Sequence, residues 1–216
     1  MYQYILFDLD GTLADTSEGI LNSAQYSLKQ CGIAEADRNK LKKFIGPPLK
    51  DTFMKLYSMD EEQATEATAK FREFYNEHGK YQCKLYNGTE HLLKSLKEHG
   101  ATLIVATSKP TVFSEEILSF LKIDQYFDGI IGSNLDNTRS KKGEIIGYIL
   151  QEYNISDKKS AVMIGDKSQD LTGAFQCGIS AIGVTYGFGT LEELSSVTSE
   201  AILNSPSSIL TYLERT

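Results

Sequence analysis

The sequence has few cysteines, no long apolar run and no excess of positive charge. Its three cysteines include no CxxC pair, so we expect reduced thiols rather than a disulfide framework or a thiolate metal site. No apolar run approaches the ~20 residues that span a bilayer, and the first residues lack the basic region of a signal peptide. These absences predict a cytoplasmic protein with no membrane partner.

The charge balance also limits the possible partners. With 22 basic and 29 acidic residues the net charge is −7, which argues against nonspecific binding to nucleic acid. A phosphate substrate is still compatible with this charge, because the local charge inside a cleft decides its binding. The 216 residues, 41% of them hydrophobic, are enough for a sizeable core, and they indicate no particular oligomeric state.

Short apolar runs alternate with helical patterns along most of the chain. Each run is continuous, as in strands that are buried on both faces. Such alternation is typical of right-handed β-α-β units, so we predict an α/β fold with a Rossmann-like, doubly wound parallel sheet. The predicted strands are residues 4–7, 103–106, 130–131, 161–164 and 179–184, and the predicted helices are residues 88–99, 112–121, 142–153 and 169–177.

The stretch between the first two predicted strands has a different pattern. It contains amphipathic helical segments and no strand-like run. We predict an inserted helical cap at residues 16–82 and an α/β core formed by residues 1–15 and 83–216. Because the insertion begins at the carboxyl end of the first strand, where parallel sheets bind ligands, we expect it to act as a lid. The apolar faces consist of Ile20, Leu21, Ala24, Leu28 and Cys31, and of Ala64, Ala67, Phe71, Phe74 and Tyr75.

The first predicted strand runs into the sequence Asp8-Leu9-Asp10-Gly11-Thr12. Residues two apart on a continuing strand point the same way, so the carboxylates of Asp8 and Asp10 can face one crevice. One aspartate can attack phosphorus, and a second can protonate the leaving oxygen and then activate water. Gly11 lets the chain turn, and Thr12 offers an N–H and a hydroxyl to an oxyanion. A calcium loop is the alternative, but an EF-hand needs glycine at its sixth position, and here glycine is fourth.

Groups that can bind phosphate stand at the ends of two later predicted strands. Thr107 and Ser108 end the second strand, where hydroxyls and turn N–H groups can bind phosphate oxygens. Lys141 and Lys142 open the helix after the third strand, and one ammonium there can neutralise the phosphate and orient the nucleophile. Taken alone, such residues are most often turns, caps or solvated pairs, and only their place at strand ends favours a functional role.

Gly165 and Asp166 follow the fourth strand, with Asp170 about one helical turn later. Mg²⁺ prefers oxygen ligands and keeps several waters, so one or two carboxylates and a phosphate oxygen suffice to bind it. Asp166 at the strand tip suits direct ligation, and Asp170 suits a supporting role. The alternative is a helix amino terminus that favours aspartate through the helix dipole.

In this order the motifs resemble those of haloacid dehalogenase superfamily phosphatases, of the phosphoglycolate phosphatase-like branch with a helical cap. Residues 8–12 match DxDGT, residues 105–107 match an apolar run ending in Thr or Ser, and residues 165–170 match GDxxxD. The resemblance implies hydrolysis of a phosphomonoester through an aspartyl-phosphate, with Mg²⁺ as cofactor. It implies these roles: Asp8 as nucleophile and metal ligand, Asp10 as general acid/base with its carbonyl on the metal, Thr107 on the phosphate, Asp166 as metal ligand and Asp170 in support. From their places at the strand ends we add Ser108 and Lys142 as phosphate-binding residues, and Gly11, Thr12 and Gly165 as supporting residues.

The sequence departs from the family pattern at two places. Many relatives have Thr-Asn-Lys where this chain has Thr107-Ser108-Lys109, and a serine hydroxyl can still donate to phosphate. Relatives often have Lys-Pro at the third motif, where this chain has Lys141-Lys142-Gly143. Alignment to the start of the helix favours Lys142 as the catalytic lysine, and Lys141 stays open as the alternative.

These motifs do not name the substrate. We expect a small phosphorylated metabolite, such as phosphoglycolate, a nucleoside monophosphate or a sugar phosphate. A pyrophosphatase and a β-phosphoglucomutase-type phosphomutase are alternatives, and a noncatalytic binding module is disfavoured by the intact aspartates. A basic residue of the cap could bind a second anionic group of the substrate, although most of these residues would form a solvated face. The candidates are Arg38, Lys40, Lys42, Lys43 and Lys50.

Overall fold

The computed structural model describes residues 2–135 and 138–215. The chain divides into two compact units: a core unit, Met1–Asp15 with Leu85–Thr216, and a helical unit, Thr16–Lys84. A two-stranded sheet of β2 (Ala14–Asp15) and β3 (Lys84–Leu85) is formed where the chain leaves and re-enters the core unit.

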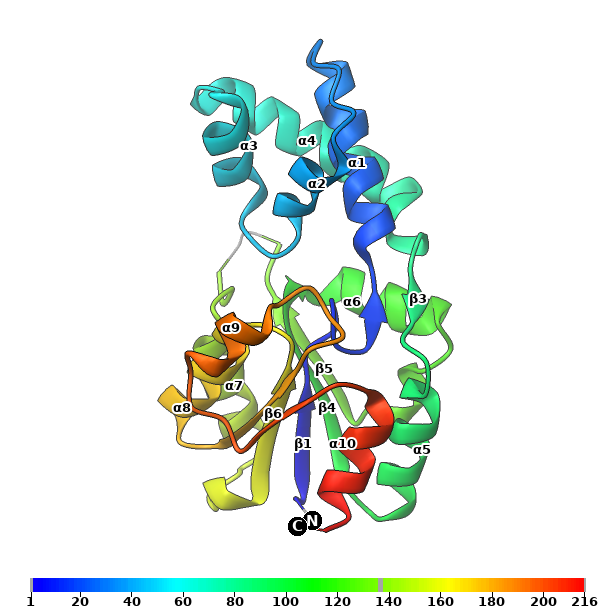
Figure 1. Cartoon of the computed structure of the whole chain (residues 1–216), viewed down its shortest axis with the longest axis vertical. Coiled ribbons are helices and arrows are strands. Elements are labelled where there is room, and N and C mark those ends of the chain that lie inside the picture. Colours follow the sequence, from blue (N-terminus) through cyan, green and yellow to red (C-terminus); the bar gives the residue numbers. More distant parts are fainter. Residues whose placement is uncertain (1, 136–137, 216) are drawn as a thin grey trace. The chain divides into compact units, whose positions relative to one another are not determined.

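The core unit contains a six-stranded sheet in which all neighbouring strands are parallel (Figure 1). The strand order is β5-β4-β1-β6-β7-β8. This sheet confirms the predicted α/β fold class. The strands are β1 (Tyr4–Phe7), β4 (Thr102–Pro110), β5 (Gly129–Ser133), β6 (Ala161–Gly165), β7 (Ser180–Val184) and β8 (Ala201–Leu203).

The direction of winding reverses at β1, which lies between β4 and β6. From β1 the chain continues to β4 and β5 on one side of the sheet. It then returns to β6 on the other side and continues outward to β7 and β8. In open parallel sheets such a reversal leaves a crevice outside the carboxyl ends of the strands, where ligands bind. The ends of β1, β4 and β6 therefore meet where a site is expected.

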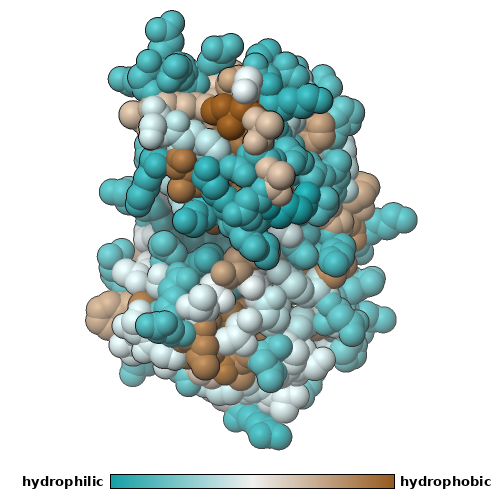
Figure 2. Space-filling view, turned by 45° about the horizontal axis from the view of Figure 1, so that its top comes forward, coloured by the Kyte–Doolittle hydropathy of each residue, from teal (hydrophilic) through white to brown (hydrophobic). Residues whose placement is uncertain are grey.

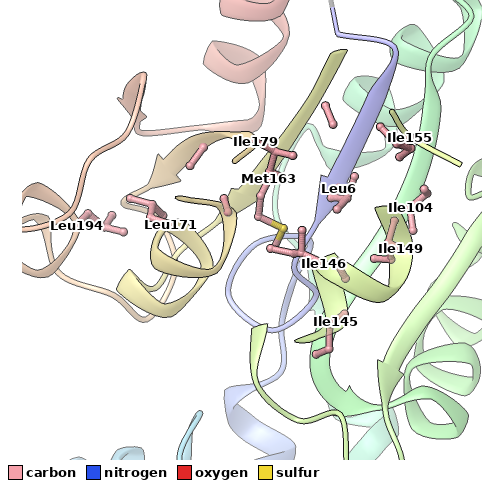
Figure 3. Close-up of a cluster of buried hydrophobic side chains, with 14 residues drawn as sticks. Leu6, Ile104, Ile145, Ile146, Ile149, Ile155, Met163, Leu171, Ile179 and Leu194 are labelled. Carbon is pink, nitrogen blue, oxygen red and sulfur yellow. The ribbon is translucent and has the colours of Figure 1, made fainter. Parts of the chain in front are cut away.

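Both faces of the sheet are buried. On one face, Leu6 of β1 and Ile104 of β4 belong to a buried cluster with Ile146 of helix α7 (Lys142–Glu152) (Figure 3). Their neighbours Ile5 and Val105 alternate to the opposite face and are also fully buried. This double burial explains why the strands appear in the sequence as continuous apolar runs rather than alternating ones.

Helices cover the two faces of this sheet (Figure 1). The helices α7 and α8 pack against each other, and α5 packs against α10. The four predicted helices all form, with bounds within one residue of those expected, but α9, α10 and the short strand β8 were not predicted. The helices of the core unit are α5 (Thr89–Glu98), α6 (Thr111–Phe120), α7 (Lys142–Glu152), α8 (Ser168–Cys177), α9 (Leu191–Ser195) and α10 (Pro206–Leu213), with 3-10 turns η3 (Asp124–Tyr126) and η4 (Lys158–Ser160).

The helical unit is organised by the packing of α1 on α4. A side chain at Gly19 would overlap the carbonyl of Gly79, so the small residue lets the chain segments approach closely. The predicted apolar faces are largely buried, except that Cys31 and Phe74 are only half-buried. The elements are α1 (Ser17–Gln30), α2 (Arg38–Leu41), η1 (Lys42–Phe44), α3 (Leu49–Tyr57), α4 (Glu61–Glu77) and η2 (Gly79–Tyr81).

Hydrophilic side chains cover much of the face shown in Figure 2, and hydrophobic ones gather there in small separate groups. This distribution agrees with the burial of most apolar residues inside the two units. Within the described ranges, no helix is long and apolar enough to cross a membrane.

Candidate active site

Asp8 lies just beyond β1, where the strand reaches the carboxyl edge of the sheet. Its backbone N–H donates to the carbonyl of Ile164 at 2.9 Å, so pairing with β6 holds the residue at the strand tip. Its side chain is only 11% exposed. A carboxylate buried this far needs a partner, and Lys142 supplies one, with its Nζ 2.8 Å from Oδ1 of Asp8.

Lys142 is the first residue of α7 and is buried. Besides Asp8, its ammonium contacts Oδ1 of Asp170 at 2.7 Å and donates to the carbonyl of Ala106 at 2.8 Å. Burial lowers the pKa of Lys142, but the charges of Asp170 and Asp8 outweigh it and hold the pKa above its ordinary value. The neighbouring Lys141 is exposed, so the structure brings Lys142 rather than Lys141 to the aspartates.

Asp166 and Asp170 complete a group of three buried carboxylates. Asp166 follows β6, Asp170 lies in the first turn of α8, and ligand oxygens of Asp8, Asp166 and Asp170 lie within 4.8 Å of one another. Asp170 also accepts the N–H of Lys167 at 3.0 Å through its other oxygen, and so caps the helix as well. A side chain at Gly165 would overlap the carboxylate of Asp170, which explains the glycine before Asp166.

Backbone N–H groups hold one oxygen of Asp166. Oδ2 accepts the N–H of Phe188 at 2.6 Å and that of Gly189 at 3.3 Å, and Oδ1 lies 3.5 Å from the hydroxyl of Thr12. Burial, reinforced by the negative charges of Asp8 and Asp170, raises the pKa of Asp166 to about 7. The carboxylate of Asp166 is therefore repelled by two neighbouring carboxylates in a buried place.

The charge balance of this cluster fits a divalent cation. Three buried carboxylates meet one buried ammonium, that of Lys142, which leaves two formal negative charges (three minus one). The donors are carboxylate oxygens, which Mg²⁺ and Ca²⁺ prefer. Burying uncompensated charge is costly, so a bound cation of charge two would balance the group.

Asp10 faces a second lysine. Nζ of Lys109, at the end of β4, lies 3.2 Å from Oδ2 of Asp10, and the lysine side chain is only 8% exposed. Gly11 follows with a φ of +88°, a left-handed conformation that favours glycine. A side chain at Gly11 would also overlap Asp166, so this glycine allows the turn after β1 to lie against Asp166.

The two hydroxyls near the end of β4 differ in their surroundings. Thr107 is buried, and its Oγ1 accepts the N–H of Lys109 at 3.3 Å. Ser108 is exposed. The structure thus places Thr107 inside the carboxyl edge of the sheet, near the ends of the neighbouring strands, and leaves Ser108 at its surface.

The chain matches the family model for haloacid dehalogenase-like hydrolases over residues 5–184. It belongs to that family. It is 46% identical to a 5'-nucleotidase of Pseudomonas aeruginosa over 89% of this chain and 87% of the relative, and 27% identical to a phosphoglycolate phosphatase of Colwellia psychrerythraea over 99% and 97%. It also aligns over 100% of both chains with the crystal structure of a predicted phosphatase from Clostridium acetobutylicum, at 46% identity and a TM-score of 0.92. These findings confirm the family that the motifs resembled, and with it the prediction of a hydrolase.

Sequence reasoning missed two parts of this site. Lys109 was noted within its motif, but nothing along the chain indicated that its ammonium would face Asp10. The loop of residues 186–189 was missed altogether, because it contacts Asp166 through backbone N–H groups, which every residue except proline carries. Its only signal in the sequence is the pair Gly187 and Gly189.

Proposed function

We propose that this protein is a Mg²⁺-dependent phosphomonoester hydrolase that acts on a small cytoplasmic phosphorylated metabolite through an aspartyl-phosphate intermediate. The observation that carries the proposal is the position of Asp8 at the tip of β1. There its carboxylate contacts the ammonium of Lys142 and lies beside the carboxylates of Asp166 and Asp170. A nucleophile, a fixed positive charge and oxygen ligands for a cation thus meet at one point.

In the first step, a carboxylate oxygen of Asp8 attacks phosphorus and the bond from phosphorus to the ester oxygen breaks. Asp10 donates a proton to the leaving oxygen, so the product departs as a neutral alcohol. Lys142 orients Asp8 through its contact with Oδ1 and neutralises charge on the phosphoryl oxygens. In the second step, Asp10 takes a proton from water, which attacks phosphorus and releases phosphate and free Asp8.

The cation would be held by Asp8, Asp166 and the backbone carbonyl of Asp10, with Asp170 in a supporting role because it is committed to Lys142. When bound, Mg²⁺ would neutralise charge on the phosphoryl group and so reduce the repulsion that an attacking carboxylate meets. We place Thr107 and Ser108 on the phosphoryl oxygens, the first as a buried group and the second as an exposed one.

The class of substrate is proposed from the relatives. The 5'-nucleotidase and phosphoglycolate phosphatase named above both act on small monoesters, so a nucleoside monophosphate and phosphoglycolate are the leading candidates. Within the helical unit, Arg38, Lys40 and Lys50 form ion pairs with glutamates of the same unit. Lys42 and Lys43 are exposed on η1, which makes them the better candidates for contact with a second anionic group.

A panel of phosphate compounds tests the proposal. Phosphate release with Mg²⁺ would be measured from phosphoglycolate, nucleoside monophosphates, sugar phosphates, pyrophosphate and an aryl phosphate, with Asp8→Asn as the blank. We expect one monoester to have a kcat/KM well above the others, and that compound names the substrate class. No release from any compound, combined with isomerisation of a sugar phosphate that depends on a bisphosphate, would replace the hydrolase by a phosphomutase.

A further inference from the structure

The loop between β7 and α9 contacts both acidic segments of the site. The hydroxyl of Tyr186 donates to the carbonyl of Thr12 at 3.0 Å, and the N–H groups of Phe188 and Gly189 donate to Oδ2 of Asp166. We call residues 186–189 the clamp loop. It therefore joins the turn that follows Asp10 to the carboxylate that follows β6.

Two glycines let the clamp loop lie against these segments. A side chain at Gly187 would overlap the carbonyl of Gly11, and one at Gly189 would overlap the carbonyl of Asp166. Neither position is in the left-handed region, so the need for glycine there comes from close approach and not from backbone conformation. Because the clamp loop lies this close to Asp166, two of its N–H groups reach one oxygen of that carboxylate.

A pair of charged side chains fixes the clamp loop from its outer side. Nζ of Lys167 donates to the carbonyl of Phe188 at 3.1 Å and lies 3.8 Å from Oε2 of Glu193, on α9. The other oxygen of Glu193 accepts the N–H of Ser168 at 3.0 Å and its hydroxyl at 2.8 Å. Glu193 thus links α9 to the start of α8. Lys167 binds the carbonyl of Phe188, which lies between the two backbone N–H groups that donate to Asp166.

We propose that Lys167 and Glu193 are positioning residues for the metal site. They fix the clamp loop, the loop occupies Oδ2 of Asp166 with two N–H donors, and Oδ1 is thereby oriented toward a cation. Asp166 needs such restraint because Asp8 and Asp170 repel its carboxylate whenever no cation is bound. Partners of metal ligands commonly set affinity in this way. This inference rests on the metal role within the proposed function.

Replacing either Lys167 or Glu193 should weaken metal binding. Loss of a group that touches a metal ligand typically costs about 10- to 100-fold in metal affinity, and Lys167 and Glu193 act one contact further out, so we expect about 3- to 10-fold for Lys167→Met and for Glu193→Gln. Lys167→Arg should keep most of the wild-type affinity, because a guanidinium can still donate to the carbonyl of Phe188.

The measurement is a titration of the free protein with Mn²⁺, followed by the electron paramagnetic resonance signal of unbound Mn²⁺ and competed with Mg²⁺. It needs no turnover. Lys97→Met is the matched control, since the pair of Lys97 with Asp128 is about as exposed (33% and 38%) as that of Lys167 with Glu193 (29% and 28%) but lies away from the acidic cluster. We expect wild-type affinity in this control.

The positioning role of Lys167 and Glu193 and the metal role of the site can be disproved separately. Wild-type affinity in Lys167→Met and Glu193→Gln would overturn the positioning role and leave the proposed function intact. A lower kcat at saturating Mg²⁺ with unchanged metal affinity would also overturn it, because that pattern indicates damage to the site without a change in cation binding. Absence of Mn²⁺ binding by the wild-type protein, with Mg²⁺ giving no activation, would refute the metal role itself. Melting temperatures of all variants show whether each is folded.

Discussion

The ammonium of Lys142 lies 2.8 Å from a carboxylate oxygen of Asp8, although the two residues are 134 positions apart in the chain. They meet because β1 ends beside the start of α7, and because α7 begins with the lysine pointing inward. The same ammonium contacts Asp170, so one buried charge serves two aspartates. With Asp166, the cluster has three carboxylates to one ammonium, and this excess of negative charge decides how the site should respond to substitution.

Replacing Lys142 with methionine should lower both the rate of turnover and the free energy of unfolding. Asp8 and Asp170 would remain buried without their cationic partner, which costs about 3 kcal/mol of unfolding free energy, and phosphate release should fall by at least about 100-fold through loss of orientation and charge neutralisation. Lys141→Met is the matched control, because Lys141 is adjacent but exposed. Equal losses in the two variants, measured by kcat and by chemical denaturation, would show that Lys142 has no special role.

Asp8→Asn should abolish turnover without unfolding the protein. An amide cannot attack phosphorus as a carboxylate does. The change also removes one of the two excess negative charges of the cluster, so we expect the melting temperature in the presence of a chelator to be equal to that of the wild type or higher. A melting temperature well below that of the wild type would show that Asp8 mainly stabilises the fold through Lys142.

Asp10→Asn should have an effect that depends on the leaving group. With an alkyl monoester, loss of proton donation should lower the rate of phosphate release by about 100-fold or more. An aryl phosphate has a leaving group that needs little protonation, so its first step should be slowed much less. Burst kinetics with the aryl substrate would then show a fast first step and slow hydrolysis of the aspartyl-phosphate. Equal slowing of the first step with both substrates would contradict the assignment of Asp10 as general acid.

Much of the fold was predictable because each of the main strands is buried on both faces, which produces continuous apolar runs such as residues 4–7. The position of each motif at a strand end followed from the parallel sheet, in which all carboxyl ends lie at one edge. In the core sheet and its covering helices, the unpredicted elements are β8, with three half-buried residues, and the helices α9 and α10, whose five and eight residues are too short for a long repeating pattern. The contact of Lys109 with Asp10 depends on side-chain direction, and the clamp loop acts through its backbone. The first leaves no pattern of residue types in the sequence, and the second leaves only the pair Gly187 and Gly189.

Removing Mg²⁺ should stop turnover and lower stability together. A ligand at ten times its Kd stabilises the native state by about 1.4 kcal/mol, which for a chain of this size raises the melting temperature by about 3–5 °C. We expect that rise for the wild type and little rise for Asp166→Asn, which loses a proposed ligand. Full activity in excess chelator would exclude a metal role, and restoration by added Mg²⁺ controls for damage by the chelator.

Two glycines of the layer formed by α7 and α8 should respond in opposite directions to alanine. At Gly173 a Cβ would lie 2.9 Å from the N of Gly143 and 3.0 Å from the Cβ of Lys142, so Gly173→Ala must push the start of α7, and with it the lysine, away from Asp8. At Gly147, inside α7, a Cβ would have no neighbour within 4 Å, so Gly147→Ala should stabilise the protein by up to about 1 kcal/mol through helix propensity alone. Chemical denaturation and kcat would be measured for both. The close contact at Gly173 is wrongly assigned if Gly173→Ala keeps wild-type stability and activity, because the lysine would then tolerate a methyl group at the point where α8 now lets it reach the nucleophile.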